Sequence, residues 1–181
     1  MGDSGHGRII PDWPGREAAT RLRQWPTIEG LARYARARAD TFAAAILVGS
    51  FAAGAADPLS DIDLILLAPD DGFAAAWALR HELHGGVVLA DWDQPREGLP
   101  EVAGHNWVTE DLILVETLFA TPSSGFRLAE PYVVLAGELP VGVTHRPPIA
   151  RSEMTGWPHA VDIAYSTFKH VLRRGPRARP S

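Results

Sequence analysis

Two aspartates that alternate along an apolar stretch are the residues best placed for chemistry. Asp61 and Asp63 open the run DIDLILLA at residues 61–68, which has the composition of a buried strand. Because side chains alternate between the two faces of a strand, both carboxylates leave the same face, with Cα atoms roughly 6.5–7 Å apart. Mg²⁺ prefers oxygen ligands of this kind. The spacing therefore predicts a site for two metal ions, which in such sites lie about 3.5–4 Å apart.

A turn just upstream adds a second part to this site. An apolar run, residues 42–48, ends at Gly49 and Ser50. A glycine lets the backbone come close to a ligand, and Ser50 offers a hydroxyl at the start of a helix-compatible stretch, residues 50–56. Free N–H groups at a helix N-terminus suit a phosphate. Gly-Ser and Asp-x-Asp are each common alone, but their combination indicates a phosphoryl-transfer site.

The two motifs together resemble the nucleotidyltransferase superfamily of DNA polymerase β type. The resemblance rests on VGSFAAG at residues 48–54 and SDIDL at residues 60–64. It covers about 42–68 strongly and extends more weakly to about 120, and it includes the antibiotic and the minimal nucleotidyltransferases. The chain departs from the pattern at Ala53, where related sequences often carry a basic residue.

The resemblance implies an enzyme that transfers a nucleoside monophosphate to a hydroxyl group. Asp61 and Asp63 would bind two Mg²⁺ ions. Gly49 and Ser50 would hold the β/γ-phosphates of ATP or another nucleoside triphosphate. A third acid from a neighbouring strand would bind one of the metal ions and take the proton from the attacking hydroxyl.

Two candidates compete for the role of third acid. Glu116 interrupts the apolar run at residues 112–118, where a lone carboxylate needs a partner that a metal would supply. Asp91 and Asp93 follow the apolar residues 87–90, at an expected strand end where solvated acids are common. Glu116 is the first choice for a catalytic and metal-binding residue, and Asp93 or Asp91 is the alternative.

Three interpretations of the function remain, of which two differ in the acceptor of the nucleotide and the third has no catalysis. Residues 121–181 follow the expected core and are enough for part of an acceptor pocket, which favours a small molecule of the aminoglycoside or antibiotic type. The alternative is a minimal nucleotidyltransferase that adenylylates a protein partner, as in toxin–antitoxin pairs. A nucleotide-binding module that has lost catalysis is the third interpretation, and the intact Asp61 and Asp63 argue against it.

The pattern along the sequence predicts that these residues are positioned by a small mixed β-sheet flanked by helices, which is an α/β or α+β fold. We expect one domain over residues 1–181, with a nucleotidyltransferase core at about 28–120 and a C-terminal extension at 121–181. The pattern predicts helices at about 16–25, 28–40, 73–84 and 158–174, and strands at 42–48, 61–68, 87–92, 105–109, 112–120 and 132–135.

Composition excludes several other classes of protein. The chain has 181 residues, no cysteine and a net charge of −5, so disulfides and a basic field for nucleic acid are not expected. No apolar run approaches the roughly 20 residues that span a bilayer, and the first residues lack the layout of a signal peptide. We therefore expect a cytoplasmic protein without nucleic-acid or membrane partners.

Histidines and tryptophans give weaker signals. His81 and His84 lie three apart on the helix expected at 73–84, a spacing that can bind a metal. They also fall in its last turn, where histidines suit a helix C-terminus, and this interpretation is favoured. Trp92 and Trp107 could stack on a base or on the acceptor, but large aromatic side chains lie more often in a core.

Overall fold

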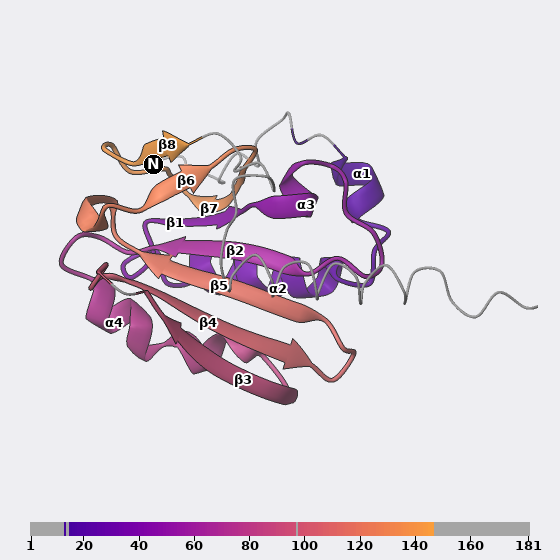
Figure 1. Ribbon diagram of the computed structural model, residues 1–181. Coiled ribbons are helices and arrows are strands. Elements are labelled where there is room, and N and C mark those ends of the chain that lie inside the picture. The colour runs from indigo at the N-terminus through magenta and orange to yellow at the C-terminus, as the bar shows by residue number, and fades with distance from the viewer. Residues whose placement is uncertain (1–12, 14, 97, 147–181) are drawn as a thin grey trace, which may run out of the picture. The chain divides into compact units, whose positions relative to one another are not determined.

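A six-stranded mixed sheet forms the centre of the structure, a computed structural model that describes residues 13, 15–96 and 98–146 (Figure 1). These residues all belong to the first of the chain's two units, residues 1–146, and the helix expected at 158–174 lies outside them. The sheet has the order β3-β4-β5-β2-β1-β7. Its strands are β1 (Ala44–Leu47), β2 (Ile62–Leu67), β3 (Val88–Pro95), β4 (Val102–Thr109), β5 (Leu114–Ala120) and β7 (Val133–Gly137).

Within this sheet only β2 and β5 run parallel to each other. Helices flank it, and a small parallel sheet of two strands completes the described fold. These further elements are α1 (Arg16–Ala19), α2 (Trp25–Arg36), α3 (Gly49–Ala52), α4 (Phe73–Ala78), the 3₁₀-helices η1 (Arg80–His84) and η2 (Pro122–Ser124), and the strands β6 (Arg127–Ala129) and β8 (Thr144–Arg146). The expected mixed sheet flanked by helices is confirmed. No described helix has the length and apolar character needed to cross a membrane.

The two faces of the sheet belong to different apolar cores. Ile62 and Leu64 of β2 share a core with Ile28 of α2. Ile65 and Leu67 lie on the opposite face of β2 and belong to a second core, together with residues of β6. Because alternate residues of a strand leave opposite faces, Asp63 is directed to the face of this second core.

Several helix boundaries differ from the sequence prediction. The helix expected at 28–40 begins at Trp25, because Pro26 occupies its first turn, where the missing N–H has no helical partner in any case. The helix expected at 73–84 is divided at Leu79 into α4 and the 3₁₀-helix η1, which ends at His84 and is followed by Gly85 with a φ of 60°. The helix expected at 16–25 is reduced to the four residues of α1. The expected hairpin of β4 and β5 is present, but β4 already begins at Val102.

Candidate active site

Three carboxylates converge where β2 and β5 lie side by side. Asp63 of β2 stands opposite Glu116 of β5 in the parallel register, and Asp61 immediately precedes β2. One oxygen of each carboxylate lies within 4.8 Å of the others, and all three residues are partly buried. Burial of Ile62 and Leu64 to 0% and 1% exposure fixes this arrangement, because a shift by one residue would turn the apolar side chains outward. The structure thus brings together the three acids that the sequence analysis ranked first.

The backbone that follows β1, at Val48 and Gly49, lies against Asp63. The backbone N–H of Val48 donates to the carbonyl oxygen of Asp63 at 3.0 Å. Gly49 has a φ of 65°, a left-handed conformation that side chains other than glycine adopt at a cost. A Cβ atom at this position would also overlap the Asp63 carboxylate. The position therefore requires glycine for two independent reasons, namely the backbone conformation and the room taken by the Asp63 carboxylate.

A Gly49→Ala variant is expected to displace the Asp63 carboxylate and to weaken binding of Mg²⁺ with ATP at least tenfold. The left-handed backbone should also lower the free energy of unfolding by about 1–2 kcal/mol. Calorimetric titration and urea unfolding measure the two effects. Gly30→Ala is the matched control, because a Cβ at Gly30 in α2 meets nothing within 4 Å; it should bind like the parent protein. Binding by Gly49→Ala that equals the binding of this control would contradict the expected role.

Ser50 follows in the first turn of α3. Its hydroxyl oxygen is buried and has no hydrogen-bond partner among the described residues. A buried hydroxyl without a partner is unfavourable, and a phosphate oxygen is a group that could accept its proton. Because α3 comprises only four residues, the contribution of a helix dipole to such a site is small, and the hydroxyl and backbone carry more of the expected interaction.

The loop that leads to Asp61 is held by a residue that the sequence analysis did not single out. Gln24 is fully buried. Its Nε2 donates to the carbonyl oxygen of Ser60 at 2.7 Å and to that of Asp57 at 3.1 Å. The Ser60 hydroxyl accepts from the backbone N–H of Asp57 at 2.9 Å. These bonds fix the backbone immediately before Asp61. No local pattern distinguishes Gln24 from a surface glutamine.

A cleft opens beside the carboxylates on the same face of the sheet. Asp63 and Glu116 line it together with three arginines, namely Arg96, Arg127 and Arg146. The cleft therefore combines carboxylates that can hold metal ions with planar guanidinium groups, which can donate two hydrogen bonds to a phosphate or a carboxylate.

The two tryptophans of the sequence analysis have different surroundings. Trp92 of β3 pairs in register with Asn106 of β4, which pairs with Glu116 of β5. Trp92 therefore shares the face of Glu116, and it is 43% exposed. Trp107 is fully buried in the core on the other face. Of the two tryptophans, only Trp92 lies on the sheet face of the carboxylates, and it is not among the residues that line the cleft.

Comparison with protein families agrees with this geometry. A family model described as a nucleotidyltransferase domain matches residues 28–124. This chain belongs to the nucleotidyltransferase domain family. The matched residues of this nucleotidyltransferase contain all five predicted site residues, and membership implies transferase activity in general and a nucleoside triphosphate as substrate. Among curated proteins, none matches the chain.

The alternative third acids of the nucleotidyltransferase lie elsewhere. Asp93 accepts a hydrogen bond from Arg80 Nε at 3.1 Å, and Asp91 Oδ2 lies 3.1 Å from His81 Nδ1. Both partners belong to η1, on the sheet face that is opposite to Glu116. The structure groups Glu116, and neither Asp91 nor Asp93, with the first two acids. The catalytic role of Glu116 stays a prediction.

Proposed function

We propose that this nucleotidyltransferase transfers a nucleoside monophosphate, AMP from ATP, to a hydroxyl group of an acceptor. The observation that carries the proposal is the convergence of Asp61, Asp63 and Glu116 within 4.8 Å, next to the backbone of Gly49. Three carboxylates on one partly buried surface form a donor set suited to hard divalent cations.

The donor set fits Mg²⁺ by its chemistry. Asp61 and Asp63 would hold two ions, and Glu116 would share one of them. When bound, such ions neutralise phosphate charge and stabilise both the attacking and the leaving oxygen. The protein contributes position and charge, because phosphoryl transfer requires little covalent chemistry from side chains.

The other residues of the site are assigned roles from their positions beside the carboxylates. The buried Ser50 hydroxyl donates to a β- or γ-phosphate oxygen, and Gly49 lets the backbone approach the same group. Glu116 accepts the proton of the acceptor hydroxyl. The acceptor oxygen then bonds to the α-phosphorus as the bond from that phosphorus to the bridging oxygen breaks, and pyrophosphate leaves. Arg127 and Arg146 stand beside the cleft, where they can contact phosphate oxygens.

The acceptor is proposed to be a small molecule, with a protein acceptor as the alternative outcome. The cleft is lined by the carboxylates Asp63 and Glu116 as well as by three arginines, so acceptors of either charge are included in the test.

Incubation of the full chain with ATP labelled at the α-phosphate tests the proposal. The reaction contains Mg²⁺ and either single antibiotics, including aminoglycosides and lincosamides, or a cell extract that contains candidate protein acceptors. We expect transfer of label to one acceptor and no transfer by Asp61→Asn. Label on a small molecule supports the first acceptor class, and label on a polypeptide supports the second. Equal labelling by Asp61→Asn and the parent protein would rule out the proposed use of the carboxylates.

A further inference from the structure

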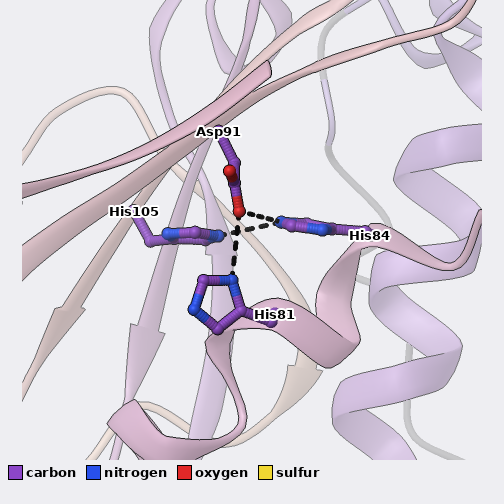
Figure 2. A group of neighbouring side chains, drawn as sticks. All are labelled: His81, His84, Asp91 and His105. Carbon is purple, nitrogen blue, oxygen red and sulfur yellow. Dashed lines mark hydrogen bonds and ion pairs between the residues drawn. The ribbon is translucent and has the colours of Figure 1, made fainter. Parts of the chain in front are cut away.

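A second cluster of potential metal ligands lies on the face of the sheet opposite the three carboxylates. His81 and His84 come from η1, Asp91 from β3 and His105 from β4. One ligand atom of each residue lies within 4.8 Å of the others. Figure 2 shows the three imidazole rings and the Asp91 carboxylate directed toward a common point.

Local structure explains why these four residues meet. In a 3₁₀-helix, side chains three positions apart eclipse each other, so η1 presents His81 and His84 on one side. Asp91 pairs with Trp107 and Asp93 pairs with His105 across β3 and β4. Alternation along the two strands therefore directs Asp91 and His105 to the same face, where η1 packs.

The separations between ligand atoms are close to those of a tetrahedral site. His84 Nε2 lies 2.9 Å from His105 Nε2, and His81 Nδ1 lies 3.1 Å from Asp91 Oδ2. His84 Nε2 is 3.9 Å from the same carboxylate oxygen. Zinc bonds of about 2.0–2.1 Å at tetrahedral angles would place ligand atoms about 3.3 Å apart. The remaining pairs of ligand atoms lie within 4.8 Å of one another, so contraction of the cluster around one ion would bring them toward that spacing.

Hydrogen bonds orient His105, the most deeply buried residue of the cluster. The His105 side chain is 0% exposed, and its Nδ1 lies 2.8 Å from Asp93 Oδ1. Because an ionised carboxylate only accepts, Nδ1 carries the proton and Nε2 presents its lone pair to the cluster. Asp93 is held in turn by Arg80. A carboxylate on the far nitrogen of a histidine is the usual support of a metal-bound imidazole.

Asp93 supports His105 as an ionised carboxylate. Burial alone would raise the pKa of Asp93, but hydrogen bonds from Arg80 and His105 outweigh this effect and lower it. Asp93 therefore remains an acceptor for His105 Nδ1–H.

We propose that His81, His84, Asp91 and His105 bind one divalent transition-metal ion, Zn²⁺ by preference, which fastens η1 to β3 and β4. Imidazole nitrogens suit zinc and similar ions, whereas Mg²⁺ prefers an all-oxygen site. Four protein ligands complete a tetrahedral shell, which is typical of structural zinc sites. Hydrogen bonds between pairs of these side chains would not by themselves require four ligand atoms to converge. This site is separate from the proposed nucleotidyl transfer and does not depend on it.

Metal titration of the full chain tests the site. An Asp61→Asn/Asp63→Asn background removes the carboxylate pair, so that added ions report on the histidine cluster. After treatment with a chelator, this protein should bind one equivalent of Co²⁺ with the visible absorption of tetrahedral cobalt, and one equivalent of Zn²⁺ should displace it. Added Mg²⁺ alone should neither produce nor displace this signal.

Variants of the cluster decide whether these residues are the ligands. His81→Ala removes a ligand whose side chain is 54% exposed, so the fold should tolerate the change. The affinity for Zn²⁺ should fall by at least about 10–100-fold, which is the loss observed when a residue that only supports a ligand is removed. His145→Ala removes a histidine outside the cluster, 37% exposed and near Glu130, and should not change the affinity. Absence of saturable binding, or equal affinities in His81→Ala and His145→Ala, would overturn the proposal.

Discussion

Replacement of Asp63 by asparagine should reduce the rate of nucleotidyl transfer by at least 10²–10³-fold, the loss typical of removing one preorganised electrostatic group from a transition state. Asp63 stands opposite Glu116 in the register of β2 and β5 and beneath the backbone of Gly49. Asparagine keeps the size of the side chain and removes its charge. The fold should therefore persist while the affinity for divalent metal is lost.

Two measurements separate these effects for Asp63→Asn. The rate is followed as release of pyrophosphate from ATP in the presence of the acceptor that the labelling experiment identifies. Thermal unfolding with and without Mg²⁺ and ATP should show ligand-dependent stabilisation of the parent protein and little of the variant, because a ligand that binds the folded state raises its stability. Parent-like stabilisation of Asp63→Asn would show that the metal ions are held elsewhere.

Asp71→Asn is the matched control for Asp63→Asn. Asp71 is an exposed acid that follows β2 at the strand's other end. The same substitution there should leave both the rate and the Mg²⁺-dependent stabilisation unchanged. A comparable loss in Asp71→Asn would indicate a general effect of charge rather than a role of the cluster.

The first half of the candidate site could be predicted because its parts are close in sequence. Strand β1, the turn at Gly49 and Ser50, and the start of β2 lie within about twenty residues. The alternation of Asp61 with buried Ile62 fixes the side of the strand on which the carboxylates lie. Local periodicity therefore predicted both the elements and the directions of the side chains.

The third acid could not be decided in this way, because its position depends on strand register. Asp63 meets Glu116 only because β5 pairs with β2 in parallel, with Ile62 opposite Val115. That pairing joins segments about fifty residues apart, and periodicity within each segment does not specify it. The role of Gln24 could not be predicted for the same reason, since its partners Asp57 and Ser60 lie more than thirty residues away in the sequence.

The histidine cluster could not be predicted from the sequence for two reasons, one local and one long-range. The spacing of His81 and His84 was visible, but a continuous helix was expected there, and the interpretation favoured a helix C-terminus. The break at Leu79 produces a 3₁₀-helix instead. Asp91 and His105 join only through the pairing of β3 with β4. Alternating acids at the end of one expected strand, followed by a histidine at the start of the next, were the signal that could have linked them.

The roles of the competing acids lead to the second large effect: Glu116→Gln should lower the rate of transfer by about 10²–10⁴-fold, the range for loss of a general base. Glutamine has nearly the same shape and cannot take up the proton of the acceptor hydroxyl. It is also a weaker ligand for a divalent cation. Glu116 is partly buried at the edge of the cleft, so the free energy of unfolding should change little.

Rates at increasing Mg²⁺ concentration distinguish the two roles of Glu116. If Glu116 acts mainly as a metal ligand, Glu116→Gln should need more Mg²⁺ for half-maximal rate and recover activity at saturation. If it acts as proton acceptor, the rate at saturating Mg²⁺ should stay low. Asp93→Asn is the comparison, because Asp93 lies on the opposite face and contacts Arg80 and His105; it should retain most of the transfer activity. An active Glu116→Gln beside an inactive Asp93→Asn whose thermal unfolding matches that of the parent protein would reverse the assignment and place the chemistry on the face of the histidines.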